Sequence, residues 1–132
     1  MNAPSPVPKP TESEMNILGV LWNHGPCTVR EVHDHLYRED GGGYTTALKL
    51  LQIMHGKGLV ARDDALRAHV FSAAVEKLPT QGRFLSDMVA RVFDGSASQL
   101  VLHALGSQQA SREELDQIRA LLDHIESKGE QP

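Results

Sequence analysis

The chain lacks several features that would place it in common protein classes. Only one cysteine, Cys27, occurs among 132 residues, so no internal disulfide can form and a reducing cytoplasm is expected. No stretch approaches the roughly 20 apolar residues that a membrane-spanning helix needs, so we expect no membrane insertion. The net charge of −4 is not the basic balance that is common in dedicated nucleic-acid binders.

Motifs of catalysis and of cofactor binding are missing as well. The sequence shows no nucleophile beside a base, and Gly41-Gly42-Gly43 lacks the Lys-Ser or Lys-Thr that follows in a phosphate-binding loop. Asp63-Asp64 falls at a predicted hairpin turn, where acidic side chains bond to the local backbone. The chain is therefore not expected to be an enzyme or to need a cofactor.

The seven histidines do not have the spacing of a metal site. His33 and His35 are two apart on one predicted helix, about 200° around its axis, so they cannot hold one ion together. Pairs such as His24 with Cys27, or His55 with His69, could meet only through the fold. We expect solvated histidines and assign no metal ligand.

Three capping boxes mark the starts of helices. In each, a hydroxyl residue stands three positions before a glutamate, so that each side chain can bond to the other residue's backbone amide. The boxes are Thr11-Glu12-Ser13-Glu14, Thr28-Val29-Arg30-Glu31 and Ser111-Arg112-Glu113-Glu114. With the apolar spacing that follows, they predict helices over Thr11–His24 and Thr28–Tyr37 and a third from Ser111 onward.

A further helix is predicted from about Thr45 to Lys57, with a short β-hairpin directly after it. Ala47, Leu50, Leu51 and Met54 share the apolar side of this helix. The opposite side carries Thr45, Thr46, Lys49, Gln52, Ile53 and Gly56. The hairpin strands are expected at Leu59–Arg62 and Ala68–Ser72, with Arg67 and His69 at or beside the tip.

This order of elements predicts a winged helix-turn-helix, with DNA as the leading partner. A polar-sided helix fits the major groove, and the hairpin behind it can reach the neighbouring backbone. Thr46 and Lys49 are candidate phosphate ligands, and Gln52 can present its amide to an adenine edge. Arg67 is a candidate phosphate contact and His69 a weaker one. Taken alone, the polar side could equally be a solvated helix face; the hairpin favours DNA.

Positive charge is concentrated in this region although the chain as a whole is acidic. Between positions 43 and 72, four cations face only Asp63 and Asp64; the cations are Lys49, Lys57, Arg62 and Arg67. We therefore expect DNA binding to depend on a modest number of phosphate contacts.

The sequence beyond Leu78 predicts helices that bury too little apolar surface to be stable alone. Pro79-Thr80 opens the first, Asp94-Gly95-Ser96 ends it, and the last helix carries a heptad seam. Folding back on the N-terminal part is one solution, but the seam favours pairing of two copies. The expected dimer contacts are Phe84, Leu85, Met88, Val92, Leu100, Leu115, Ile118, Leu122 and Ile125.

The fold class is thus mainly α with a small β-hairpin wing, in two domains. We expect a winged helix-turn-helix domain at 11–78 and a helical dimerisation domain at 79–127. Residues 1–10 hold four prolines and are expected to form a disordered arm and not a signal peptide. Residues 128–132 are expected to be a flexible tail.

From Pro10 to about Ile125 the layout resembles the penicillinase-repressor family of transcriptional regulators, also called the BlaI/MecI/CopY family. The order and spacing of several short motifs carry the resemblance. These are Pro10-Thr11-Glu12-Ser13-Glu14 with Leu21-Trp22, Thr28-Val29-Arg30-Glu31-Val32, Tyr44-Thr45-Thr46, Lys57-Gly58-Leu59-Val60, Ala68-His69-Val70-Phe71, and Phe93-Asp94-Gly95-Ser96 before Leu100-Val101-Leu102.

The resemblance implies a cytoplasmic homodimer that sits on a double-stranded dyad operator and blocks transcription. It also implies release by cleavage in the dimerisation domain, downstream of a membrane sensor metallopeptidase. With the residues above, the candidate DNA-binding set is Thr28, Tyr44, Thr45, Thr46, Lys49, Gln52, Ile53, Arg67 and His69.

The chain departs from the family pattern in its recognition helix. Leu48 and Ile53 stand where other members often place a basic or polar side chain. Base reading is therefore expected to rest more on the threonines, Lys49 and Gln52, with a thymine methyl as the candidate contact of Ile53.

Two further departures concern regulation. The scissile Asn-Phe step of some members falls at His103-Ala104, so these two residues mark the possible proteolysis region, in which another nearby bond could also serve. No cysteine follows Cys27, which excludes the Cys-x-Cys copper sensing of one branch. A protein–protein adaptor, with Leu48 and Ile53 facing a partner, and a metal-responsive regulator remain as alternative functions.

Overall fold

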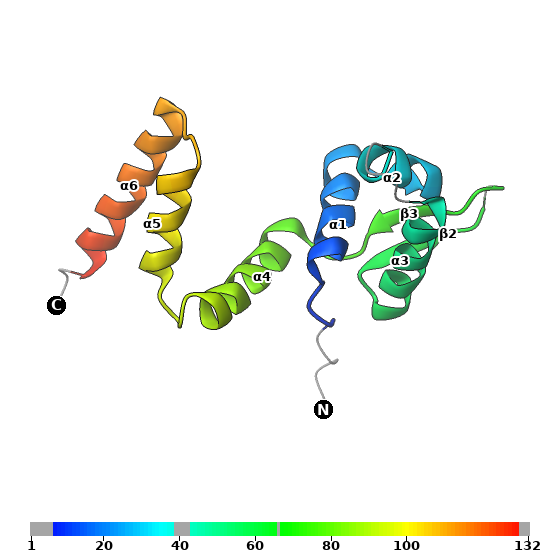
Figure 1. Cartoon of the computed structure of the whole chain (residues 1–132), viewed down its shortest axis with the longest axis horizontal. Helices are drawn as coiled ribbons and strands as arrows, with labels where there is room; N and C mark the ends of the chain where they lie inside the picture. The colour runs from blue at the N-terminus through cyan, green and yellow to red at the C-terminus, as the bar shows by residue number, and fades with distance from the viewer. Residues whose placement is uncertain (1–6, 39–42, 66, 130–132) are drawn as a thin grey trace. The chain divides into compact units, whose positions relative to one another are not determined.

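A computed structural model describes residues 7–38, 43–65 and 67–129 of the chain. The chain divides into two compact units, Met1–Asp87 and Met88–Pro132, which are described one at a time below. Within the described residues the order of elements is α1, β1, α2, α3, β2, β3, α4, α5 and α6 (Figure 1). The fold is mainly helical with a small sheet, as predicted.

The first unit opens with two helices whose starts are both fixed by capping boxes. In α1 (Glu12–His24), Thr11 Oγ1 accepts the Glu14 amide at 3.2 Å and Glu14 Oε1 accepts the Thr11 amide at 2.8 Å. In α2 (Val29–Leu36), the same two bonds join Thr28 and Glu31 at 3.2 and 2.9 Å. The predicted starts of both helices are confirmed.

The next helix, α3 (Tyr44–Lys57), leads directly into a strand because Gly58 reverses the chain. Gly58 has φ +86, and its amide bonds to the His55 carbonyl while the Leu59 amide bonds to that of Met54. This left-handed helix end suits glycine, which has no Cβ to clash. At the other end Gly43 caps α3 with φ −79, whereas Gly41 and Gly42 lie outside the described residues.

A three-stranded antiparallel sheet joins the hairpin to the turn between α1 and α2. Its strands are β1 (Cys27–Thr28), β2 (Val60–Asp63) and β3 (Val70–Ala73), in the order β1-β3-β2. The hairpin was predicted, but β1 was not, because two residues are too short to show an alternating pattern. Cys27 pairs with Phe71, so the buried cysteine lies on a strand that holds the base of the wing.

The core of the first unit lies where the three helices meet this sheet. Ala47, Leu51 and Met54 of α3 are fully buried, and Leu50 is only partly buried. They pack with residues of α1, α2 and the sheet, namely Ile17, Leu18, Val20, Leu21, Cys27, Val29, Val32, Leu59, Val60 and Phe71. Burial of this side of α3 leaves its opposite side to solvent.

The Glu14 carboxylate joins the start of α1 to the end of α3. Its side chain is only 2% exposed, and Lys57 Nζ donates to both of its oxygens, at 3.0 and 2.9 Å. Burial alone would raise the pKa of Glu14, but the bonds from Thr11 and Lys57 outweigh it, so the pKa lies below its ordinary value. The folded state therefore holds this carboxylate ionised.

Residues 7–10 are not a disordered arm, contrary to the sequence-based expectation. Pro10 is fully buried and Val7 packs against the core. Arg83 Nη1 donates to the Val7 carbonyl at 2.8 Å, and Lys9 forms an ion pair with Asp87. The expectation failed because only tertiary contacts order this segment; residues 1–6 lie outside the described part.

The helix α4 (Lys77–Val92) starts slightly earlier than Pro79, the predicted start. Proline is tolerated there because first-turn amides have no partner within the helix. Just before α4, the Val75 carbonyl accepts a hydrogen bond from Trp22 Nε1 at 3.1 Å. Such contacts move the division between units to Asp87/Met88, inside α4, and away from the expected boundary at 78/79.

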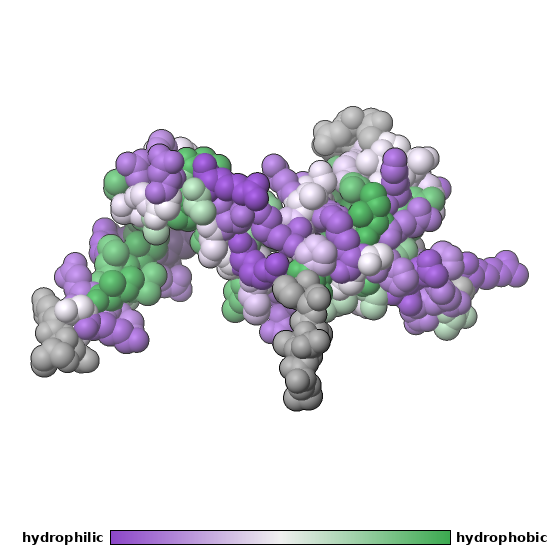
Figure 2. Space-filling view, turned by 90° about the horizontal axis from the view of Figure 1, so that it is seen from below, coloured by the Kyte–Doolittle hydropathy of each residue, from purple (hydrophilic) through white to green (hydrophobic). Residues whose placement is uncertain are grey.

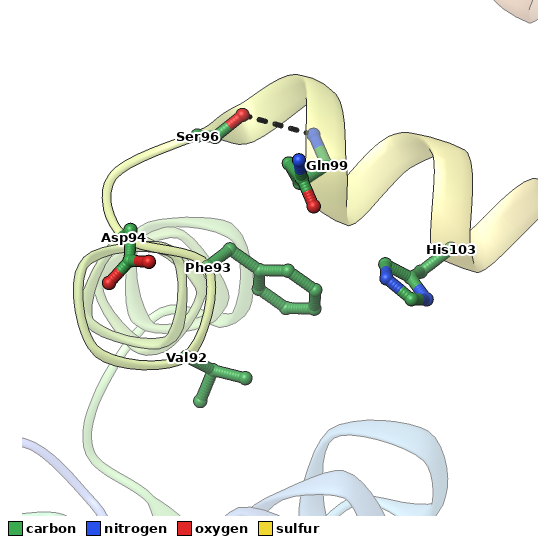
Figure 3. A pocket seen from close by; sticks show the side chains of 6 residues that line it. All are labelled: Val92, Phe93, Asp94, Ser96, Gln99 and His103. Atoms are coloured by element: carbon green, nitrogen blue, oxygen red, sulfur yellow. Dashed lines mark hydrogen bonds between the residues drawn. The ribbon is translucent and has the colours of Figure 1, made fainter.

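The second unit holds the rest of α4, α5 (Ala97–Ser107) and α6 (Arg112–Gly129). Asp94 and Gly95, with φ of 51° and 82°, end α4 where predicted, and Ser96 Oγ caps α5 by accepting the Gln99 amide at 3.2 Å (Figure 3). At this corner the centroids of the Phe93 and His103 rings lie 5.6 Å apart. The third predicted capping box is present at the start of α6, and that helix extends into the expected tail.

The helices α5 and α6 run antiparallel (Figure 1) and leave much apolar surface exposed. No residue of either helix is buried in the described structure. Figure 2 shows hydrophobic surface on this unit, at the left of the view. Its large exposed hydrophobic side chains are Val92, Val101, Leu102, Leu105, Leu121, Leu122 and Ile125. Among described residues, no helix is long and apolar enough to cross a membrane.

Replacing the buried carboxylate tests its part in the fold. We expect Glu14→Gln to lower the free energy of unfolding by about 2 kcal/mol at pH 6, because a charged acceptor of several hydrogen bonds is lost. A group whose folded pKa is depressed stabilises above its unfolded pKa and loses that effect as pH falls through the folded pKa. The difference between wild type and variant should therefore shrink below about pH 4.5, as urea unfolding at pH 6 and pH 3.5 would measure.

Glu12→Gln is the matched control, since Glu12 lies exposed in the same helical turn. It should change stability by less than about 0.5 kcal/mol at either pH. Equal stability of Glu14→Gln and wild type at pH 6 would contradict a stabilising role for the buried carboxylate.

Candidate nucleic-acid interface

The solvent-facing side of α3 carries the side chains that the sequence singled out. Thr45, Thr46, Lys49 and Gln52 are all on the outer side of the helix, and Ile53 is 41% exposed. Lys49 makes no ion pair with any residue that the structure describes. Polar donors and one cation therefore project from a helix whose other side is fixed in the core, as the helical wheel predicted.

A depression of about 430 Å³ adjoins the first turns of α3. Three separate segments line it: the start of α2, the start of α3 and the loop between β2 and β3. The lining residues are Thr28, Val29, Arg30, Tyr44, Leu48, Arg67, Ala68 and His69. The fold thus brings together four predicted site residues, Thr28, Tyr44, Arg67 and His69, that are far apart in sequence.

Arg30 lines this depression and was not among the predicted site residues. Its guanidinium carbon lies 5.6 Å from the centroid of the Tyr44 ring, within the range of a cation–π contact. The sequence carried one usable signal, since a basic residue follows two positions after the Thr28 helix cap. Nothing local indicated that Tyr44 would lie under it.

The wing, which consists of β2, β3 and the loop that joins them, carries ion pairs of its own. Asp64 Oδ1 lies 2.9 Å from Arg62 Nε and 2.6 Å from His69 Nδ1. Burial acts to raise the pKa of Asp64, but hydrogen bonds from His69 and Arg62 bring it below its ordinary value. Asp63 instead accepts the Ala65 amide at 2.9 Å, as expected of an acidic turn residue.

These ion pairs correct the charge balance read from the sequence. Of the four cations between positions 43 and 72, Lys57 bonds to Glu14 and Arg62 bonds to Asp64. Lys49 and Arg67 have no ion-pair partner among the described residues, and Arg30 adds a third cation from α2. The positive surface is therefore smaller than the sequence count indicated, and it centres on α3 and the depression.

Two of the histidines, His24 and His35, contact each other, and neither lines the depression. The His24 and His35 rings stack with centroids 4.1 Å apart, and His33 Nδ1 lies 3.3 Å from Asp34 Oδ1. Over the described ranges, no three or more histidine, cysteine or acidic side chains gather as metal ligands would. No metal site is assigned.

Comparison with known protein families assigns the chain to one of them. The sequence matches the family described as "Penicillinase repressor" over residues 10–124. The chain belongs to the penicillinase repressor family. Because the match covers both compact units, it confirms the resemblance inferred from the short motifs.

Individual relatives agree with this assignment. The penicillinase repressor of Bacillus licheniformis is 20% identical over 122 residues, which cover 92% of this chain and 95% of that protein. The transcriptional regulator BlaI of Mycobacterium tuberculosis (strain H37Rv) is 30% identical over 118 residues, covering 86% and 83%.

Solved structures with a similar chain path include a mutant of MepR from a multidrug-resistant clinical isolate of S. aureus. That structure has a TM-score of 0.45 and 22% identity, and the match covers 92% of this chain and 80% of that chain. A probable transcriptional regulator from Pseudomonas aeruginosa gives a TM-score of 0.45 and 21% identity, over 88% and 78%.

Membership of the penicillinase repressor family fixes the general function. The chain is a winged-helix, DNA-binding transcriptional repressor and not an enzyme. The exposed side of α3, the depression beside it and the wing are the features of the first unit that suit this function.

The wing ion pairs give a test of how charge is distributed over this surface. We expect Asp64→Asn to tighten binding to the protein's own promoter DNA by about threefold to tenfold at low salt. The substitution releases Arg62 and His69 and removes a negative charge that would face phosphates. Fluorescence anisotropy at several salt concentrations would also show a steeper salt dependence.

Asp63→Asn is the control, because it removes the same charge but releases no cation, and asparagine can still accept the Ala65 amide. Its effect should be clearly smaller. If the two variants bind alike, the pairing at Asp64 has no influence on the DNA surface.

Proposed function

We propose that the chain is a cytoplasmic homodimer that represses transcription from a dyad operator. Each protomer sets α3 in a major groove and its wing against the flanking backbone. The observation that carries this proposal is the pairing of a solvent-exposed polar face on α3 with a cation-lined depression next to it.

The side chains on α3 divide into backbone and base contacts. Lys49 and Thr46 suit phosphates, because they offer a charge and a hydroxyl from the exposed face. Gln52 suits an adenine edge, and the 41%-exposed Ile53 suits a thymine methyl group. Thr45, in the first turn, is placed to serve either a base or a phosphate.

Contacts at the edge of the groove come from the residues around the depression. Arg67 suits a phosphate and His69 a weaker contact, since His69 is already paired with Asp64. The Thr28 hydroxyl accepts the Glu31 amide, which leaves its own proton to donate. Tyr44 is 43% exposed and takes part through its ring, which lies beside the Arg30 guanidinium at this edge.

The exposed apolar surface of the second unit supports dimer formation. Neither α5 nor α6 has a buried residue. Folding of this unit alone would therefore remove too little apolar surface from water to make it stable. Leu122 and Ile125 on the heptad seam are 51% and 56% exposed. We propose that a second copy covers them, together with Phe84, Leu85, Met88, Val92, Leu100, Leu115 and Ile118.

A dimer fixes the distance between its two identical winged-helix domains, called heads below. We therefore propose an operator whose half-sites lie about one helical turn apart, or slightly more, with dyad symmetry that mirrors the dimer. Each head alone offers few phosphate contacts, so repression should require both.

Release by proteolysis, triggered by a membrane sensor metallopeptidase, is a part of the proposal that rests on the family resemblance. His103 and Ala104 lie inside α5, where their carbonyls accept hydrogen bonds from Ser107 Oγ and the Gln108 amide. A protease cleaves extended backbone, so a cut there would require α5 to unfold locally.

An adaptor function is less well supported, because one of its two proposed contacts is partly buried. Leu48 is partly buried and packs against the core, which leaves Ile53 as an isolated exposed apolar residue of α3 beside polar neighbours. Scattered apolar residues of this kind are normal on protein surfaces.

The first test concerns the proposed phosphate contact of Lys49. We expect Lys49→Ala to weaken binding to operator and to unrelated DNA alike, by about fivefold near 0.15 M salt, because phosphate contacts carry no sequence information. The slope of log K against log salt concentration should fall by about one. Anisotropy titrations over a salt series measure both quantities.

Gln52→Ala provides the contrasting control on the same face. It should keep the wild-type salt slope and relax the preference at one base pair, as a binding-site selection experiment would show. Wild-type affinity and slope in Lys49→Ala would rule out Lys49 as a phosphate ligand.

The second test concerns the dimer. Leu122→Glu places a charge on the heptad seam, which is costly to bury, so the mass in solution should fall from about twice the 14.5 kDa of one chain towards one chain. Operator affinity should fall by about tenfold or more, since two linked heads bind with avidity. Analytical ultracentrifugation and anisotropy give the two readings.

Gln117→Glu adds the same charge to an exposed position of α6 that lies off the seam. It should leave both mass and affinity near wild-type values. A wild-type protein that is already monomeric at micromolar concentration would overturn the dimer proposal.

A further inference from the structure

We propose that the depression between α2, α3 and the wing is a seat for one backbone phosphate of DNA, and that Arg30, held by the Tyr44 ring, is its principal ligand. This inference rests on the proposed DNA-binding function and adds a residue and a mode of contact to it. The occupant is a phosphate diester of the duplex that α3 reads.

The composition of the depression fits such an occupant. Arg30 and Arg67 line it from two different segments, and none of the described residues that line it is acidic. Two acidic residues close to the lining in sequence are already bonded: Glu31 accepts the Thr28 amide, and Asp64 pairs with Arg62 and His69. An anion in this place would meet two guanidinium groups, while both of these carboxylates already accept other donors.

The cation–π contact gives Arg30 a defined position. A free arginine loses much rotamer freedom when it binds, whereas a guanidinium already lying 5.6 Å from an aromatic centroid has lost part of it beforehand. The planar guanidinium can keep its face on the ring while its edge offers paired N–H donors to two phosphate oxygens. Tyr44 thus acts as a positioning residue for Arg30.

The surroundings strengthen the same assignment. Arg30 lies in the first turn of α2, where unpaired amides and the helix dipole favour a negative charge. The Thr28 hydroxyl proton is available in the same depression. Because α3 begins at Tyr44, a phosphate seated here would lie beside the first turn of that helix and fix its register along the groove.

Removal of the guanidinium should weaken DNA binding without changing sequence preference. We expect Arg30→Gln to reduce affinity for the promoter fragment by about fivefold to tenfold near 0.15 M salt and to lower the salt slope by about one. Arg30→Lys should keep the salt slope and recover only part of the affinity, because an ammonium cannot form the paired contact. Arg112→Gln, which changes the net charge equally but lies in the other compact unit, should leave the slope unchanged.

A double-mutant cycle tests the role of the ring. Tyr44→Leu should weaken binding by about threefold in the wild-type background and have no effect in Arg30→Gln, while Tyr44→Phe should match wild type. Additive losses would show that Tyr44 contacts DNA on its own and would overturn its positioning role. Thermal unfolding of each variant separates these effects from a loss of fold.

The outcomes also separate this inference from the proposed function. If wild type binds its promoter with a strong salt dependence but Arg30→Gln has the same affinity and slope, the phosphate seat is wrong and the repressor proposal stands. If wild type itself shows no salt-dependent binding, the proposed function fails, and the phosphate seat fails with it.

Discussion

The placement of α3 depends on one buried carboxylate. Glu14 closes the capping box of α1 and at the same time accepts two hydrogen bonds from Lys57 at the far end of α3. The carboxylate would be costly to bury alone, and the Lys57 ammonium compensates its charge. The apolar side of α3 supplies the burial energy, while this ion pair fixes which end of the helix meets α1. The exposed polar face takes its direction from both.

Features that depend on neighbouring residues could be predicted from the sequence. The capping boxes at Thr11, Thr28 and Ser111 involve partners three positions apart, and the buried side of α3 follows from helical spacing alone. The strand β1 and the packing of Val7 could not be predicted in this way. Each depends on a partner brought near by the tertiary fold, such as Phe71 across the sheet from Cys27 or Arg83 from α4.

The same limit applies to the candidate site. The sequence identified Lys49 and Gln52 because both lie on the polar face of one helix. It counted Lys57 and Arg62 in the positive charge of this region, since only the fold shows that they pair with Glu14 and Asp64. It missed Arg30, which gains its position only when the start of α2 meets Tyr44. Charge counting along a sequence therefore overstates a binding surface wherever the fold pairs its cations.

The salt links at Asp64 have a consequence for how such a repressor would find its operator. A wing that already satisfies Arg62 and His69 internally displaces few counterions from any random stretch of the chromosome. The repressor should then stay only briefly on non-specific DNA and spend more of its time at new positions. Weak DNA binding by the wing would thus lower the maximum affinity for the operator but speed the search for it along the chromosome.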